Sequence, residues 1–175
     1  MKHSLRIITV ILFAVSVMAQ QKPDFSGRWT SEPEAAAPSS GGRGTSVGNM
    51  GSGWGSNITI AQDATRLTVE YAFFARGDLQ PPLKFVYALD GSQTKNSVML
   101  GRGIQTQTSK TAWEGDKLII TTEHNLENPA NGQPMTIKVI QSLSFQSPTS
   151  LLVETTRSGV LGGSSTTTRT IYKKN

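Results

Sequence analysis

The chain has 175 residues, no cysteine and a formal net charge of +5 at pH 7. This length fits one domain with a hydrophobic core of its own. The lack of cysteine excludes disulfides, zinc sites with sulfur ligands and a lipid anchor on cysteine. Lysines and arginines are scattered and form no basic stripe of the kind that follows phosphates, so nucleic acid is not an expected partner.

Residues 1–19 have the pattern of a secretory signal peptide. Two basic residues precede an apolar run over 7–17, and Val17-Met18-Ala19 has the small residues of a cleavage site. The apolar run is shorter than the roughly 20 residues that span a bilayer, and no later run is longer. We therefore expect an exported protein, periplasmic or extracellular, with no integral membrane segment after cleavage and a single domain over 20–175.

Residues 24–30 predict the first β-strand. Phe25, Gly27 and Trp29 alternate with polar residues, so one face of the strand can enter a core while the other meets water. Gly27 leaves room for a ring or another chain segment to lie close to the strand.

The Gly-rich stretch 31–55 predicts a flexible loop between the first two strands. It has no core-forming periodicity, and a connection this long within a compact domain is either functional or disordered. Trp54, near its end, is interpreted either as part of a lid over a cavity or as an anchor for the returning chain.

Nine further strands follow from alternating apolar residues and from turn sequences such as Asp90-Gly91. They are expected at residues 56–61, 66–74, 83–89, 97–100, 105–113, 117–124, 135–145, 150–157 and 166–174. Most connections are too short for a helix, which favours antiparallel pairing in up-and-down order. Because closure removes exposed edges, we predict an all-β, up-and-down β-barrel of about 8–10 strands. A sandwich usually needs long crossovers, and only 31–55 has the length for one.

The segment Phe25-Ser26-Gly27-Arg28-Trp29 resembles the F-x-G-x-W opening strand of the calycin barrels, which include lipocalins and fatty-acid-binding proteins. The resemblance implies a lumen that holds a small ligand. It also implies that Trp29 closes one end of the barrel, with a basic side chain of a late strand over its ring. Arg169 is the position expected to supply that cation, which attracts the indole face.

The leading hypothesis is therefore a lipocalin-like carrier of a small apolar ligand, monomeric and without a cofactor. The apolar residues expected to line the lumen and bind the ligand are Trp29, Leu67, Val69, Tyr71, Phe85, Tyr87, Trp113, Ile120 and Ile137. The alternative is a filled barrel that serves as a structural or protein-binding module of the envelope. The charged and polar strand residues Arg28, Arg66, Glu70, Lys84 and Gln105 are expected to point outward. Any of them that pointed into the lumen would instead meet an anionic or polar head group there.

No catalytic or metal-binding residue is predicted. His124 is the only histidine after the leader, and its place at a predicted strand end is typical of a solvated side chain. No G-x-S-x-G nucleophile elbow is present. A cyclase or isomerase on the same scaffold would need a pocket lined by Glu70, His124 or a tyrosine with a perturbed pKa.

A second calycin branch gives a further alternative. Gly27-Arg28-Trp29-Thr30, followed by Ser56 and Tyr71, is similar to the first strands of avidin. The resemblance implies biotin contacts at Ser56 and Tyr71, but the chain has few tryptophans to form the walls of such a pocket.

Overall fold

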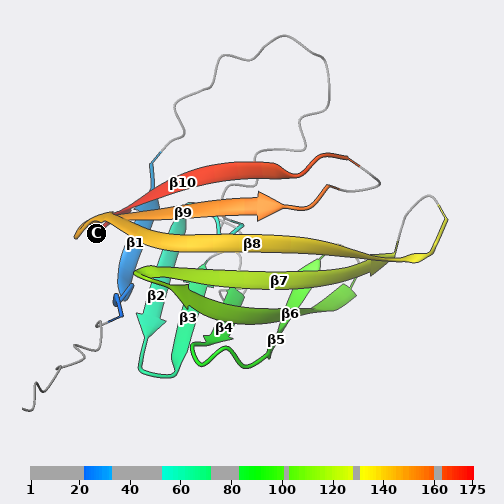
Figure 1. Cartoon of the computed structure of the whole chain (residues 1–175), viewed down its shortest axis with the longest axis horizontal. Helices are drawn as coiled ribbons and strands as arrows, with labels where there is room; N and C mark the ends of the chain where they lie inside the picture. The colour runs from blue at the N-terminus through cyan, green and yellow to red at the C-terminus, as the bar shows by residue number, and fades with distance from the viewer. Residues whose placement is uncertain (1–21, 33–52, 72–82, 101–102, 128–130, 160–162) are drawn as a thin grey trace, which may run out of the picture.

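The computed structural model describes residues 22–32, 53–71, 83–100, 103–127, 131–159 and 163–175 (Figure 1). The predicted signal peptide and most of the predicted loop 31–55 lie outside these ranges.

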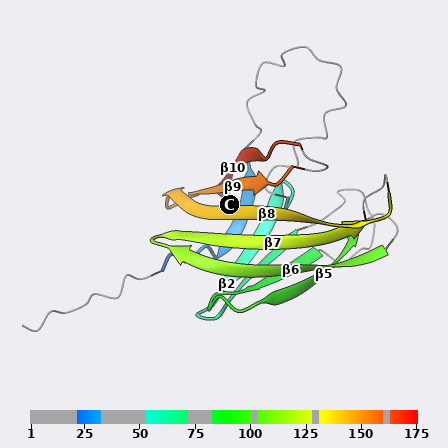
Figure 2. The same cartoon turned by 45° about the vertical axis from the view of Figure 1, so that its right-hand side comes forward.

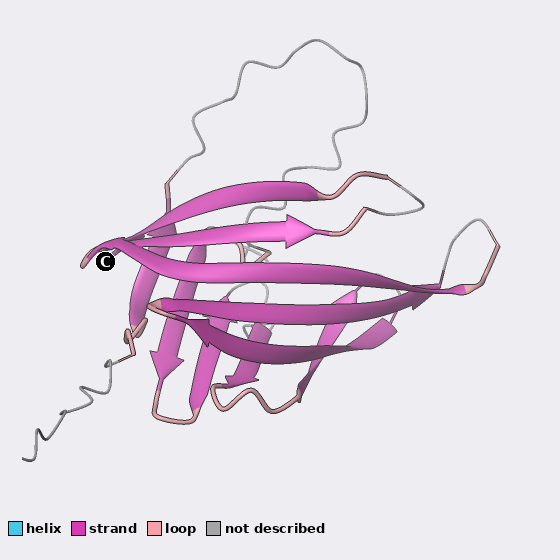
Figure 3. Ribbon diagram, viewed as in Figure 1, coloured by secondary structure: helices cyan, strands magenta, loops and turns pink. Residues whose placement is uncertain are grey.

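Ten antiparallel strands make up the described part of the chain, which contains no helix (Figure 3). The strands are β1 (Gly27–Ser31), β2 (Asn57–Gln62), β3 (Arg66–Tyr71), β4 (Leu83–Ala88), β5 (Thr94–Leu100), β6 (Gly103–Glu114), β7 (Lys117–Glu127), β8 (Pro134–Ser147), β9 (Ser150–Arg157) and β10 (Thr166–Lys174). They form one sheet in the order β4-β3-β2-β1-β10-β9-β8-β7-β6-β5. The predicted all-β, up-and-down architecture is confirmed.

The sheet curls into a nearly closed barrel. β1 pairs with both β2 and β10, so the first and last strands of the chain join the two halves of the sheet. Figures 1 and 2 show β1–β4 crossing steeply behind the longer strands β6–β10. The two ends of the sheet meet through side chains: the amide of Asn96 on β5 hydrogen-bonds the backbone of Val86 on β4, and Thr111 on β6 donates to the carbonyl of Ala88 on β4.

The strand bounds differ from the predicted ones mainly at three ends. β5 begins at Thr94 rather than at residue 97, and β7 continues to Glu127 rather than ending at 124. β1 begins at Gly27, so Phe25 precedes the strand but is fully buried. The longer β7 places His124 within the sheet instead of at its end.

An aromatic cluster fills the end of the barrel where the β6–β7 and β8–β9 turns lie. The ring of Phe25 lies 6.2 Å from that of Trp113 and 5.0 Å from that of Phe145, centroid to centroid. Trp29 is fully buried, and its Nε1 donates to the carbonyl of Phe25 at 3.0 Å. The buried indole N–H is thus satisfied, as a buried Trp requires. This cluster closes one end of the barrel.

Trp54 is part of the core rather than of an exposed loop. Its side chain is 2% exposed and packs on Tyr87, with ring centroids 6.3 Å apart. The hydroxyl of Tyr172 donates to the carbonyl of Gly55 at 2.7 Å and ties down the adjacent backbone. These contacts support the interpretation of Trp54 as an anchor for the chain that returns to β2.

Lys174, not Arg169, supplies the cation over Trp29. The Nζ of Lys174 lies 5.3 Å from the centroid of the Trp29 ring, and the two residues are paired between β10 and β1. Arg169 lies five residues earlier on β10, where its Nε is 3.3 Å from a carboxylate oxygen of Glu154. The expectation for Arg169 was wrong because the register of β10 against β1 pairs Trp29 with Lys174, the last residue of β10, and not with a residue in the middle of the strand.

Candidate functional site

Strand register sorts the inward side chains of β6–β9 into rows around the barrel. The row nearest the aromatic cluster consists of Trp113, Leu118, Leu143 and Val153, and the next of Thr111, Ile120, Gln141 and Thr155. The third consists of Ser109, Thr122, Val139 and Arg157, and the fourth of Gln107, His124 and Ile137. The inner surface therefore changes from apolar to polar along the barrel axis.

The exposure of the inward side chains also increases along the barrel axis, away from the aromatic cluster. Leu118, Leu143 and Val153 have no exposed surface, so the first row is packed as core. In the third and fourth rows, Val139, Arg157 and His124 face inward by register yet are only partly buried. Solvent therefore reaches the inner surface at the end away from the aromatic cluster. We call the polar side chains there the polar inner wall: Gln107, Ser109, Thr122, His124, Gln141, Thr155 and Arg157.

Three hydroxyl groups and the amide of Gln141 form the buried part of the polar inner wall. Ser109 Oγ and Thr122 Oγ1 are 2.8 Å apart across β6 and β7 and satisfy one another. Thr155 is fully buried, and its Oγ1 has no hydrogen-bond partner among the described residues. Buried hydroxyls in native proteins are nearly always hydrogen-bonded to protein or to ordered water. The hydroxyl of Thr155 is thus a buried polar group that no described residue satisfies.

His124 and Arg157 are the ionisable side chains of the polar inner wall. Burial lowers the pKa of His124 below its ordinary value of 6.5, and the positive charge of Arg157 lowers it further. Burial also lowers the pKa of Arg157. Because the loss of water disfavours the charged form of each group, both lie in a partly dehydrated environment. At neutral pH the imidazole is therefore mostly neutral and stands beside a guanidinium.

Arg157 reaches towards the anchor at Trp54. Its Nη2 lies 3.5 Å from the position that a Cβ on Gly53 would occupy. Trp54 follows directly and packs against Tyr87, whose pKa is raised by burial. The polar inner wall and the aromatic side chains of β4 therefore approach one another at the chain segment that enters β2.

The predicted ligand-binding residues fall into two groups. Trp29, Leu67, Val69 and Ile120 are fully buried within the core cluster. Tyr71, Phe85 and Tyr87 are also buried members of that cluster, whereas Trp113 and Ile137 are only partly buried. The rings of Tyr71, Phe85 and Tyr87 stack in sequence, with centroids 5.8 Å and 6.5 Å apart. Their contact with a ligand stays a prediction.

Sequence reasoning missed most of the polar inner wall. It treated His124 as solvated, although the side chain faces inward and is half-buried. Thr155 and Arg157 continue the alternation of Leu151 and Val153 on β9, and this signal was available in the sequence. Reading that alternation to the end of the strand would have placed both residues on the inward face.

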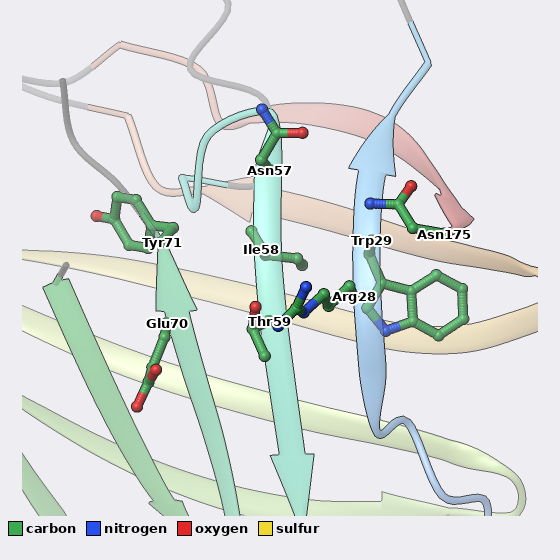
Figure 4. A pocket seen from close by; sticks show the side chains of 8 residues that line it. All are labelled: Arg28, Trp29, Asn57, Ile58, Thr59, Glu70, Tyr71 and Asn175. Carbon is green, nitrogen blue, oxygen red and sulfur yellow. The ribbon is translucent and has the colours of Figure 1, made fainter. Parts of the chain in front are cut away.

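A groove of about 280 Å³ lies over β1, β2 and β3, lined by Arg28, Trp29, Asn57, Ile58, Thr59, Glu70, Tyr71 and Asn175 (Figure 4). Register aligns Arg28, Thr59 and Glu70 across the three strands. Glu70 is 3.1 Å from Lys84, and both side chains are well exposed. Arg28, Arg66 and Lys84 are exposed, as expected of outward residues. Exposed charges are screened by water, so this groove is the weaker candidate for specific binding.

The two positions proposed from the similarity to avidin do not line a common pocket. Tyr71 is nearly buried and faces inward, whereas Ser56 is exposed. Ser56 accepts a hydrogen bond from the backbone N–H of Ser31 through its carbonyl. Ser56 therefore acts in the described structure through its backbone.

Within the described ranges, no three His, Cys, Asp or Glu side chains are grouped closely enough to hold a metal ion. None of the described residues belongs to a helix that is long and apolar enough to cross a membrane. The comparison with known proteins adds no relative: no protein-family model and no curated protein matches this chain.

Proposed function

We propose that this protein is an exported, lipocalin-like β-barrel that binds a small molecule against the polar inner wall. One observation carries the proposal. At one end of the barrel the inward side chains are apolar and mostly buried, whereas at the opposite end they are polar and partly exposed. A core built for stability alone would continue the apolar rows, because a buried hydroxyl without a partner costs about 1–3 kcal/mol. Thr155 carries such a hydroxyl.

The proposed ligand is amphipathic. Its polar part would meet the polar inner wall, and its apolar part would lie against the stacked rings of Tyr71, Phe85 and Tyr87 and against Ile137. Binding sites of this kind combine apolar walls with a few placed polar groups. The core would support the site through four fully buried side chains, Trp29, Leu67, Val69 and Ile120.

Membership of the calycins and export are parts of the same proposal. The up-and-down barrel, the buried Trp29 near its closed end and the cation of Lys174 over the Trp29 ring support the first. The leader-like pattern of residues 1–19 supports the second.

Two measurements test the proposal. Organic extraction of the purified protein, followed by mass spectrometry, should release a copurified small molecule. Titration with the neutral fluorescent probe N-phenyl-1-naphthylamine should give saturable binding that amphipathic compounds compete away. If nothing copurifies and no probe binds, the protein is instead a filled barrel that acts as a structural or protein-binding module.

Neighbouring residues on β8 provide a matched test of the location. Val139 faces inward in the third row, whereas Ile140 faces outward, and both are partly buried. Val139→Trp should fill the accessible end and weaken probe binding by about tenfold or more, while Ile140→Trp should leave it within about twofold. Equal effects of the two substitutions would place the binding elsewhere.

A further inference from the structure

The connection between β7 and β8 contains an asparagine followed by a glycine. Asn131 and Gly132 stand shortly before β8, and both are exposed. Gly132 has a φ of +67°, and a Cβ placed on it would have no described atom within 4 Å. Water therefore reaches the peptide bond that joins the two residues, and no described side chain shields it.

The side chain of Asn131 is folded back over the backbone that follows it. Its Oδ1 accepts a hydrogen bond from the backbone N–H of Gln133 at 3.1 Å. In an Asx turn of this kind the side-chain carbonyl lies over the next peptide group. Gly132 has no Cβ that would obstruct an approach between Cγ of Asn131 and its own backbone nitrogen. These two atoms can therefore close a succinimide ring.

Other asparagines of the chain lack this combination. Asn131 is the only one that a glycine follows. Asn57, Asn96 and Asn125 lie within β2, β5 and β7, where strand pairing holds the backbone extended. The amide of Asn96 is also held at both its oxygen and its nitrogen by the backbone of Val86. Sequence and local structure thus single out Asn131.

The turn at Asp90 shows the same geometry with different chemistry. The backbone N–H of Ser92 donates to Oδ1 of Asp90 at 2.8 Å, and Gly91 between them has a φ of +81°. The hydrogen bonds from Ser92 lower the pKa of Asp90, so its side chain is a carboxylate at neutral pH. A carboxylate resists attack by an amide nitrogen and has no ammonia to release. Asp90 is therefore an internal comparison for Asn131.

We propose that Asn131 is a site of spontaneous deamidation in the folded protein. The backbone nitrogen of Gly132 bonds to Cγ of Asn131, the Cγ–Nδ2 bond breaks, and ammonia leaves with the proton of the Gly132 N–H. Water then opens the succinimide. Attack at Cγ gives aspartate, and attack at the backbone carbonyl gives isoaspartate, in which the main chain runs through Cγ. The reaction consumes one water and involves no oxidant or reductant.

The modification changes the accessible end of the barrel. Register places the β7–β8 connection beyond the pair Glu127 and Pro134, at the end away from the aromatic cluster. Both products add a negative charge there, and isoaspartate also lengthens the backbone of the connection. The inference does not depend on the proposed function, because the reaction needs only the turn and water.

The experiment follows Asn131 in the purified full chain, incubated in mildly alkaline buffer with and without urea. Trypsin releases the peptide Leu118–Lys138, which carries both Asn125 and Asn131, and fragmentation in the mass spectrometer locates the conversion of amide to acid. Asn131 should convert in the folded protein at a rate within about threefold of that in the unfolded chain, because an exposed turn opens at little cost. Asn125 should stay intact in the folded protein.

Isoaspartate is measured separately with an isoaspartyl methyltransferase and labelled S-adenosylmethionine. The aged wild-type protein should accept label, and Asn131→Gln should abolish it, because glutamine does not close the succinimide. Asn125→Gln is the matched control and should leave the labelling unchanged. The peptide Phe85–Lys95, which carries Asp90 and Gly91, should stay unlabelled.

Two results would overturn the inference. The first is an Asn131 that stays intact in the folded protein while the unfolded chain loses its amide, because the native turn would then protect the site. The second is labelling of Asn131→Gln equal to that of the wild type, because the isoaspartate would then come from another position.

Discussion

The side-chain amide of Asn96 makes the two hydrogen bonds to Val86 that a neighbouring strand would otherwise make. Its Oδ1 accepts from the backbone N–H of Val86 at 2.8 Å, and its Nδ2 donates to the carbonyl of Val86 at 3.0 Å. Asn96 is 6% exposed and lies on β5, whereas Val86 lies on β4. One side chain thus joins the two ends of the sheet where the backbone ladder stops.

Asn96→Ala should destabilise the barrel by about 3 kcal/mol, because it leaves a donor and an acceptor of Val86 without partners in a part-buried place. The measurement is the free energy of unfolding in urea. Ser97→Ala, at the adjacent exposed position, should change this free energy by less than about 0.5 kcal/mol. Equal unfolding midpoints for the two variants would mean that the seam does not depend on Asn96.

Gly27 is required by the close approach of Lys174 and Trp29. A Cβ at position 27 would lie 2.8 Å from Lys174 Cε and 3.3 Å from Trp29 Nε1. Gly27 also has φ +150°, where a side chain is strained, so Gly27→Ala should cost about 2 kcal/mol of stability. Because Lys174→Ala removes the nearer atom, the double variant should lose less than the sum of the two single variants. Strict additivity in urea unfolding would contradict this contact.

Stability should fall as the pH drops through the range in which His124 titrates. Burial and the charge of Arg157 lower the pKa of His124 in the folded protein, so the unfolded chain takes up the proton first. The contribution is full above the unfolded pKa of about 6.5 and is lost as the pH falls from there towards the lower folded value. Urea unfolding at about pH 7.5 and about pH 5.5 should show this loss.

The control for the pH effect is His124→Gln, which should flatten the difference between the two pH values. β6 presents Gln107 to His124 and β8 presents Ile137, so Arg157 is the charged group that faces it among the described residues. Asp24 also titrates with a lowered pKa, but its loss of charge falls below about pH 4, outside the window. An unchanged slope in His124→Gln would reject the assignment.

Thr155→Val should stabilise the ligand-free protein by about 1 kcal/mol. The substitution keeps the shape of the side chain and removes a buried hydroxyl that has no partner among the described residues. Thr122→Val is the matched comparison and should destabilise by about 1 kcal/mol, since it breaks the hydrogen bond with Ser109. Thermal unfolding of both variants, after removal of any bound compound, would reveal the opposite signs. Shifts of the same sign would contradict this prediction.

The local parts of the fold were predictable from the sequence. Alternation of Leu67, Val69 and Tyr71 correctly assigned the buried face of β3, and Phe85 and Tyr87 did so for β4. Both patterns have period two, which is a property of the strand backbone alone. The role of Gly27 as a place where a ring lies close was also confirmed, by its contact with Trp29.

The candidate site was not predictable to the same extent. The expectation for His124 was wrong because the strand end was placed at residue 124, whereas β7 runs to Glu127. Sequence reasoning did not single out Arg157, because the pairing of β9 with its neighbouring strands decides whether its side chain faces inward. A basic residue at the end of a strand is normally solvated, whereas Arg157 faces the interior by register and lies beside His124.

The sequence by itself determined the ten strands, their up-and-down order and which residues of each strand share a face, because turn chemistry and two-residue alternation act between near neighbours in the chain. Only the tertiary structure decided that Lys174 rather than Arg169 covers Trp29, that Asn96 bridges the seam, and that Arg157 lies beside His124. These relationships depend on the register and curvature of strands far apart in sequence. They are settled when the whole sheet closes, since packing and hydrogen bonding across all ten strands select one register together.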